Sequence, residues 1–463
     1  MARDPVVSVI IATWGRPHVL RHAIGCALGQ TLREIEVIVV GDCTDAETVR
    51  VISSIKDSRL RFINLPINYG EQSGPNNIGV LSAQGEYVAF LNHDDFWFPD
   101  HLATALTWLQ ASGSDLCFTG AAVLVPPEVQ KENADFPWLV GFLGQTGDAL
   151  YTPLTLHVPA SLWVLKREIH ENLAGWRPAA ECRRESSRDF LLRAWRSGYR
   201  MRSVPIVSAI LLPSTARQDS YLEQISGTHD KIASMLSGGP ASLRATLCDR
   251  MVEGPGPRLG ARLLKPLKLA AIRLGLHPVL LHGRRKPLTR KGEQIDHLRR
   301  QRGLPKLARS GASIEMLKYH AARLACPDTR TGDAIDFSTS GSGSRHKAGG
   351  WAPSTADGSW MNSAQASLVI RTRKGAMSPL GVSVTGRVGS EGQRIELLAA
   401  GKLIGVIEGK NELSVWQFSI PHAAVEPDGL VELELRELSA HRMTRSRDKG
   451  LFLLARLELV KPD

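Results

Sequence analysis

Cysteine is scarce in this chain, and long apolar runs are absent. The 463 residues include six cysteines, with no Cys-x-x-Cys pair and no histidine spacing suited to zinc. Scattered cysteines of this kind fit a reducing cytoplasm, where each acts as a small buried hydrophobe. No run of about 18 apolar residues is free of charge, so no membrane span is predicted. Residues 6–12 are too short an apolar run for a signal peptide, so we expect a cytoplasmic protein.

The composition is that of a soluble globular protein with two or three domains. Hydrophobic residues make up 43% and charged residues 22% of the chain, which excludes disordered and fibrous classes. The net charge of +11 is local, because residues 258–309 hold 15 Lys and Arg against Glu293 and Asp296. The rest of the chain therefore carries a net charge of about −2.

Strands and helices alternate over roughly the first 120 residues. This rhythm predicts an α/β domain with a mainly parallel sheet, in which ligands bind beyond the carboxyl ends of the strands. The expected strands cover residues 6–13, 35–40, 60–65, 87–91 and 115–119, and helices are expected at 19–30, 46–55, 76–83 and 99–111.

The later parts of the chain differ in texture. Residues 236–330 are helical and basic, whereas several runs after Gly332 alternate apolar and polar residues with period two. Such strands with turn residues between them predict an all-β sandwich. We therefore expect an α/β domain at 1–235, a basic helical linker at 236–330 and a C-terminal β-sandwich at 331–463.

An apolar strand ends abruptly in Asn92, His93, Asp94 and Asp95. Two adjacent acids at a ligand-binding edge repel each other unless a cation or solvent screens them. Mg²⁺ or Mn²⁺ is held by such sites, through one or two carboxylates and phosphate oxygens. The alternative is an exposed turn that caps the next helix.

Two further residues follow apolar strands. Asp42 comes after residues 35–40, where a carboxylate can accept hydrogen bonds from a base or ribose. Its alternative is a helix N-cap or loop acid. Trp14 follows the first strand, where it either stacks on a base or packs in the core.

In this order the segments resemble family 2 glycosyltransferases. Residues 7–16 (VSVIIATWGR) resemble the family's opening VSVIIPTYNR, and residues 85–102 resemble its GEYIAFLDxDDxWxPxxL. Shorter matches are a helix end at 27–31, a strand end at 38–42 and an N-x-G at 77–79. The resemblance covers about residues 6–205. It implies a Rossmann-like GT-A fold, a nucleoside-diphosphate sugar donor, and Mn²⁺ or Mg²⁺.

The resemblance also assigns residues. Asp94 would be the metal ligand with Asp95 as helper, although Asn92 and His93 replace family residues of the D-x-D motif and Gly41 replaces an aspartate. The residues expected to bind the nucleotide sugar are Thr13, Trp14, Arg16, Asp42, Asn77, Asn92 and His93.

The acceptor base is expected at the start of a helix. Residues 186–193 match the family's E-D-x-D-L-x-x-R stretch, and Ser187 falls on the usual base position. Asp189 is the predicted base, with Glu185 as the second candidate. The alternative is that Asp189 only complements the helix N-terminus.

Residues 258–274 alternate cations with leucines at near-helical spacing. They either lie on an anionic membrane surface, which would make the protein peripheral at the inner face of the cell membrane, or form a solvated helical linker. Nucleic acid is not expected as a partner, because no aromatic platform accompanies the charge.

The sequence therefore predicts an inverting, metal-dependent glycosyltransferase. Its acceptor would be a glycan or a lipid-linked precursor in surface polysaccharide biosynthesis. Two other classes stay open, namely a nucleotidyltransferase and a non-catalytic glycan-binding protein with a decayed transferase domain. In the β-sandwich, Trp351 and Trp360 either stack on sugars or plug the core.

Overall fold

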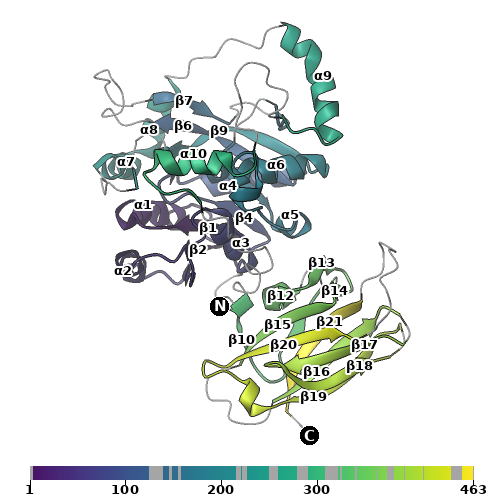
Figure 1. Ribbon diagram of the computed structural model, residues 1–463. Coiled ribbons are helices and arrows are strands. Elements are labelled where there is room, and N and C mark those ends of the chain that lie inside the picture. Colours follow the sequence, from purple (N-terminus) through teal and green to yellow (C-terminus); the bar gives the residue numbers. More distant parts are fainter. Residues whose placement is uncertain are drawn as a thin grey trace. The chain divides into compact units, whose positions relative to one another are not determined.

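The chain forms two compact units, Met1–Gly311 and Ala312–Asp463 (Figure 1). No described helix combines the length and apolarity that a membrane crossing requires. The predicted division at 235 and 330 stays a prediction. The computed structural model describes residues 4–124, 139–144, 149–154, 158–214, 220–221, 227–249, 259–278, 290–307, 322–323, 326–338, 341–361, 363–372, 380–390, 392–409, 411–438 and 451–461.

A mixed sheet runs through the first unit in the order β3-β2-β1-β4-β8-β6-β9-β5, with β7 beside β6. Strands β1 to β4 are parallel, as are β6 and β9, whereas β5, β7 and β8 run antiparallel to their neighbours. The predicted α/β class is confirmed. The strands are β1 (Val7–Thr13), β2 (Ile35–Gly41), β3 (Leu60–Asn64), β4 (Tyr87–Phe90), β5 (Phe96–Trp97), β6 (Leu116–Leu124), β7 (Leu139–Leu143), β8 (Trp163–Lys166) and β9 (Met201–Leu211).

The helices of this unit begin where their sequences favour it. Pro17 opens α1, since a helix needs no backbone N–H at its first position. At α2, the side chain of Asp45 accepts a hydrogen bond from Thr48 N at 2.8 Å. The described helices are α1 (Pro17–Leu28), α2 (Ala46–Ser54), α3 (Ser73–Leu81), α4 (His101–Ala111), α5 (Glu168–Asn172), α6 (Ser186–Arg196), α7 (Gly227–Gly238), α8 (Pro240–Cys248), α9 (Leu259–Arg273) and α10 (Glu293–Gln301).

The first strands are buried on both faces. All seven residues of β2 are buried, which explains why its sequence is apolar on both faces apart from Glu36, whose carboxylate pairs with Arg61 at 2.7 Å. Helix α3 packs closely on β1, and a Cβ placed on Gly79 would overlap Cγ2 of Ile10. The glycine of the Asn77-Ile78-Gly79 motif is therefore needed for packing.

The second unit consists mainly of antiparallel strands in two sheets. One sheet has the order β10-β15-β20-β17-β18 with β12 beside β15, and the other has β13-β14-β21-β16-β19 with β11 beside β21. Both contribute alternate residues, such as Leu368 and Val382, to one apolar core. The predicted all-β class is confirmed. The strands are β10 (Asp328–Thr329), β11 (Ala334–Asp336), β12 (Lys347–Gly349), β13 (Trp351–Thr355), β14 (Gly358–Met361), β15 (Gln365–Thr372), β16 (Leu380–Val388), β17 (Arg394–Ala399), β18 (Lys402–Glu408), β19 (Ser414–Ile420), β20 (Leu430–Glu437) and β21 (Phe452–Val460).

The two tryptophans that the sequence singled out in the second unit, Trp351 and Trp360, both contact neighbouring side chains. Trp351 is buried in the core, stacks on Phe337 with 6.5 Å between ring centroids, and donates from Nε1 to Ser367 O at 2.9 Å. Trp360 is half-buried, and the guanidinium of Arg387 lies 5.3 Å from its ring centroid. Trp351 therefore plugs the core, which was the alternative to sugar stacking.

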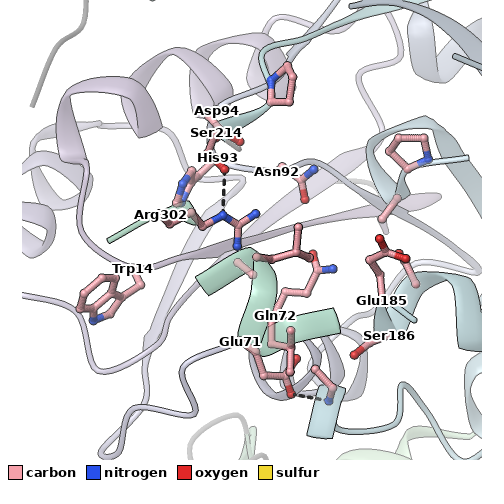
Figure 2. A pocket seen from close by; sticks show the side chains of 18 of the residues that line it. Trp14, Glu71, Gln72, Asn92, His93, Asp94, Glu185, Ser186, Ser214 and Arg302 are labelled. Carbon is pink, nitrogen blue, oxygen red and sulfur yellow. Dashed lines mark hydrogen bonds between the residues drawn. The ribbon is translucent and has the colours of Figure 1, made fainter. Parts of the chain in front are cut away.

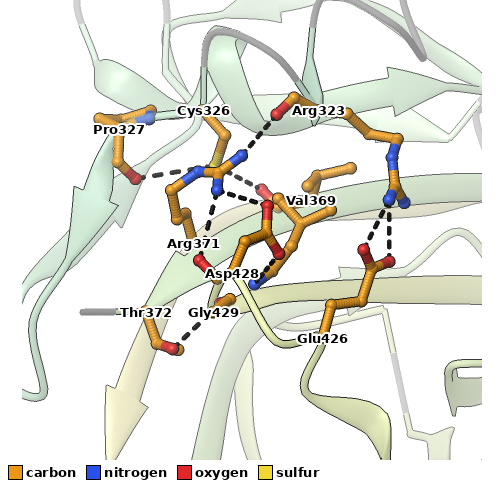
Figure 3. A network of polar contacts seen from close by, with 10 residues as sticks. Arg323, Cys326, Pro327, Val369, Arg371, Thr372, Glu426, Asp428 and Gly429 are labelled. Atoms are coloured by element: carbon orange, nitrogen blue, oxygen red, sulfur yellow. Dashed lines mark hydrogen bonds and ion pairs between the residues drawn. The ribbon is translucent and has the colours of Figure 1, made fainter. Parts of the chain in front are cut away.

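A polar network fastens the entry segment of the second unit to its sheets (Figure 3). Arg371 of β15 donates to Asp428 Oδ2 at 2.7 Å and to Arg323 O at 2.8 Å. Arg323 in turn donates to both carboxylate oxygens of Glu426, at 2.7 and 2.9 Å. Bidentate arginine pairs fix orientation better than single contacts, so this network orders the chain just before the sandwich.

Replacing Gly79 by alanine should destabilise the first unit by about 1–3 kcal/mol, because the added methyl group overpacks the contact with Ile10. Gly25 is the matched control. It lies in α1 with no heavy atom within 4 Å of an added Cβ, so Gly25→Ala should stabilise by about 0.5–1 kcal/mol. Urea unfolding followed by far-ultraviolet circular dichroism measures both. Equal effects of the two substitutions would contradict this packing.

Candidate functional site

A cavity of about 370 Å³ lies beyond the carboxyl ends of β1, β2 and β4 (Figure 2). It is lined by residues at or after the ends of these three strands, by residues 185–187 at the start of α6, and by one face of α10. In the view of Figure 2, Trp14 and Glu185 lie on opposite sides, with Arg302 between them. The predicted residues that line the cavity are Thr13, Trp14, Asp42, Asn92, His93, Asp94, Asp95 and Glu185.

Three predicted residues are not among those that line the cavity: Arg16, Asn77 and Asp189. The side chain of Asn77 is buried, donates to Trp176 O and accepts from Trp176 N. His170 Nε2 lies 2.8 Å from the same amide oxygen, so Asn77 joins α3 to the Trp176 loop. The role of Asn77 in binding the nucleotide sugar stays a prediction.

A buried ion pair holds Asp94. Arg16 Nη1 lies 2.9 Å from Asp94 Oδ2, and the arginine side chain is only 3% exposed. Arg16 has a φ of 57°, a conformation that residues other than glycine rarely adopt. Burial works against the ionised form of Asp94, but the positive charges around it, with Arg16 in contact, lower its pKa. Asp94 is therefore an anion at neutral pH.

His93 links three elements of the pocket. Its Nδ1 lies 3.2 Å from Thr13 Oγ1, and its Nε2 lies 3.4 Å from the hydroxyl of Tyr221. Burial lowers the pKa of His93 to about 4, so the imidazole is neutral at physiological pH. Trp14 stacks on Tyr221 with 6.0 Å between centroids, and it is 38% exposed. The rings of Trp14 and Tyr221 therefore form an aromatic wall of the cavity that His93 holds in place, and part of the Trp14 ring stays exposed.

Asp42 holds the rim of the cavity. Its two carboxylate oxygens accept hydrogen bonds from the backbone N–H groups of Tyr69 at 2.7 Å and Gly70 at 2.8 Å. Burial raises the pKa of Asp42 to about 6, against the effect of these bonds. The carboxylate of Asp42 therefore holds the loop after β3 at the edge of the cavity.

Asp95 differs from its neighbour Asp94. It accepts hydrogen bonds from Ser161 Oγ at 2.6 Å, Asn92 Nδ2 at 2.9 Å and Leu212 N at 3.2 Å. Burial raises the pKa of Asp95 to about 7, with a further contribution from the charge of Asp94. These contacts brace the turn after β4, whereas Asp94 carries the charge.

The two candidate bases also differ. Asp189 accepts from Arg193 Nε at 2.7 Å and lies 3.8 Å from Arg177, which fixes its carboxylate within α6. Glu185 lines the cavity and accepts from Gln294 Nε2 at 3.2 Å through Oε1. Its Oε2 is buried, accepts no hydrogen bond from the described residues and forms an ion pair with Arg188 Nε at 3.7 Å. The geometry therefore favours Glu185, the second candidate, over Asp189.

Among the lining residues that were not singled out from the sequence are Glu71, Tyr221, Arg299 and Arg302. Burial raises the pKa of Glu71 to about 7, although Ser73 N donates to it at 2.7 Å. An acid in a glycine-containing loop at the carboxyl edge was a usable signal for Glu71. The arginines belong to the basic segment, where helical spacing with Ile295 and Leu298 was the available signal.

Asp94 is the residue that fits a divalent cation best. No described part of the chain brings together three acidic, histidine or cysteine side chains as a metal cage. Mg²⁺ and Mn²⁺ nevertheless bind through one or two carboxylates when phosphate oxygens and water complete the shell. The ionised Asp94 fits such a phosphate-dependent site.

Arg16→Ala should destabilise the first unit by about 3–5 kcal/mol at pH 7, because it leaves the charge of Asp94 buried and unpaired. The loss should shrink as the pH falls, since a protonated Asp94 needs no counter-charge. Arg21→Ala is the control, because its ion pair with Asp230 is about half exposed and should contribute under about 1 kcal/mol. Urea unfolding between pH 5 and 8 measures both, and a pH-independent loss would contradict the ion pair as its cause.

Comparison with known proteins gives the family of the first domain. Residues 8–174 match the model for glycosyl transferase family 2. The segment is 30% identical over 139 residues to a putative colanic acid biosynthesis glycosyl transferase, WcaA, of Escherichia coli, covering 30% of this chain and 50% of the relative. It is 33% identical over 112 residues to the succinoglycan biosynthesis protein ExoO of Rhizobium meliloti, covering 24% and 32%.

A third relative is the UDP-Glc:alpha-D-GlcNAc-diphosphoundecaprenol beta-1,3-glucosyltransferase WfaP of Escherichia coli, at 32% identity over 23% of this chain and 41% of the relative. The chain thus spans half or less of these relatives. Among solved structures, S. aureus TarS 1-349 with UDP-GlcNAc has a TM-score of 0.37 at 18% identity, covering 45% and 58%. The mannosyltransferase PcManGT of Pyrobaculum calidifontis has a TM-score of 0.36 at 18% identity, covering 65% and 84%. The chain therefore carries a glycosyl transferase family 2 domain at residues 8–174.

Proposed function

We propose that this protein is an inverting glycosyltransferase that moves a sugar from a nucleoside diphosphate to a glycan or lipid-linked acceptor. The observation that carries the proposal is one cavity that the ionised Asp94 and the carboxylate of Glu185 both line, in a chain whose residues 8–174 match the family 2 model. Asp94 marks the donor side, next to Trp14 and Asp42. Glu185 marks the acceptor side, at the start of α6.

The donor side has the parts that a nucleotide needs. The exposed ring of Trp14 offers a stacking surface for a base, and Asp42 lines the same cavity, where a ribose would lie beside it. The diphosphate belongs near Asp94. Mn²⁺ or Mg²⁺, when bound there, supplies charge neutralisation of the leaving group, and Asp94 would hold it. Asp95 supports this turn through its three hydrogen bonds.

The acceptor side needs a base. An inverting transfer requires a carboxylate that takes the proton of the acceptor hydroxyl as the anomeric carbon is attacked. Glu185 lines the cavity, and its Oε2 accepts no hydrogen bond from the described residues and only pairs with Arg188 Nε at 3.7 Å, so we assign this role to Glu185. Asp189 instead keeps Arg193 in place, which donates to the carbonyls of Leu173 and Gly175.

Surface polysaccharide biosynthesis is the proposed setting. The names of the relatives refer to colanic acid, succinoglycan and a diphosphoundecaprenol-linked sugar, which supports a lipid-linked acceptor. Helix α9 supports a position at an anionic membrane surface, because Leu264, Leu267 and Leu274 are 51, 69 and 90% exposed on a basic segment. Arg196 donates to Ile272 O at 3.0 Å and so ties α9 to α6.

Nucleotide binding is the first test. Thermal unfolding with UDP, GDP or dTDP, each with and without Mn²⁺, should show stabilisation by one base, worth ~2.7 kcal/mol at ~100 times the Kd. Asp94→Asn should remove the Mn²⁺-dependent part of this shift, each variant being compared with its own ligand-free state. No shift with any nucleotide would exclude a transferase and favour the decayed, glycan-binding alternative.

The choice of base is tested by two isosteric variants. Glu185→Gln should lower kcat for transfer to polyprenyl-diphosphate-linked sugars by about 10²–10⁴-fold while nucleotide binding stays unchanged, because only proton transfer is lost. Asp189→Asn should keep kcat within a few fold and lower thermal stability instead, because it weakens the ion pair with Arg193. The reverse pattern, with Asp189→Asn inactive and folded, would return the role to Asp189.

A further inference from the structure

One face of α10 and the residue just beyond it form a wall of the donor cavity. Ile295, Leu298, Arg299 and Arg302 all line the cavity, and they are spaced i, i+3, i+4 and i+7 along the chain. This is the spacing of one helix face. The basic segment therefore sends two guanidinium groups toward the pocket rather than only toward solvent.

Hydrogen bonds hold this wall against both sides of the cavity. Arg299 donates to Gly70 O, in the loop that Asp42 fixes, and to Pro305 O at 2.7 Å. At the other side, Gln294 donates to Glu185 Oε1 at 3.2 Å. Arg302 Nε donates to Ser214 Oγ at 3.1 Å, beyond the end of β9. The helix thus spans from the Asp42 rim to the start of α6.

Arg302 brings a second guanidinium close to the one that pairs with Asp94. The guanidinium carbons of Arg16 and Arg302 lie 5.2 and 5.5 Å from the ring centroid of Tyr221. Arg16 is paired with Asp94, but within the described part of the chain Arg302 uses only Nε, which leaves Nη1 and Nη2 as open donors. A half-buried guanidinium that lines the cavity and keeps two open donors offers a binding site for an anion.

We propose that Arg302, with Arg299 beside it, binds the diphosphate of the donor and that α10 is a built part of the donor pocket. The inference rests on the proposed function for the identity of the anion. Arginine suits this task, because its planar group donates two parallel hydrogen bonds to phosphate oxygens. Arg302 would act in binding and positioning, alongside any cation that Asp94 holds.

Calorimetric titration tests the proposal with inorganic pyrophosphate and with the diphosphate and nucleoside of the preferred base, in EDTA and again with Mn²⁺. Arg302→Gln should weaken pyrophosphate and nucleoside-diphosphate binding about 10- to 100-fold in EDTA, because it removes charged hydrogen bonds. Nucleoside binding should be unchanged, which also shows that the variant is folded. Arg302→Lys should recover part of the loss.

Arg300→Gln is the matched control, since Arg300 belongs to the same helix but is exposed and does not line the cavity. It should change each affinity less than twofold. Equal nucleoside-diphosphate affinity in wild type and Arg302→Gln would overturn the diphosphate site while leaving the transferase proposal intact. Pyrophosphate binding that depends on Arg302, without binding of any nucleotide, would keep the anion site and overturn the transferase instead.

Discussion

The buried ion pair between Arg16 and Asp94 is the interaction on which the site depends. It joins the turn after β1 to the turn after β4, which follow two neighbouring strands. Of the two residues, Asp94 lines the cavity. An isolated charge at either position would be too costly to bury, so each residue requires the other or a substitute. The left-handed backbone at Arg16 and the braced Asp95 both serve to keep this pair in register.

Around this pair, the pocket is built from contacts that restrict motion rather than from contacts that bind ligand. Asp42, His93 and Asn77 form hydrogen bonds with other residues of the protein. These bonds hold the loop after β3, the rings of Trp14 and Tyr221, and helix α3 in place. Preorganised groups of this kind lose little freedom when a ligand arrives. The side chains to which we assign contacts with the ligand are Trp14, Glu185 and Arg302, which all line the cavity.

The sequence allowed strands β1 to β4 and β6 and the strand-end residues of the pocket to be predicted, because strand ends of a parallel sheet meet at one edge wherever the loops go. Thr13, Asp42 and Asp94 follow from that rule alone. The pairing of Asp189 with Arg193 did not, since both lie one turn apart on α6 and the motif does not say which carboxylate faces the cavity. Arg302 was missed because a basic helix has several uses, and periodicity does not reveal where a helix docks.

The position of α10 along the chain has a consequence for how such proteins diversify. The family match ends at residue 174, whereas the wall formed by α10 comes from more than a hundred residues later. A fragment limited to residues 8–174 would keep the strand-end residues of the cavity but would lack the wall that α10 forms. Substitutions in α10 would therefore change one wall of the cavity while the residues matched to the family stay unchanged.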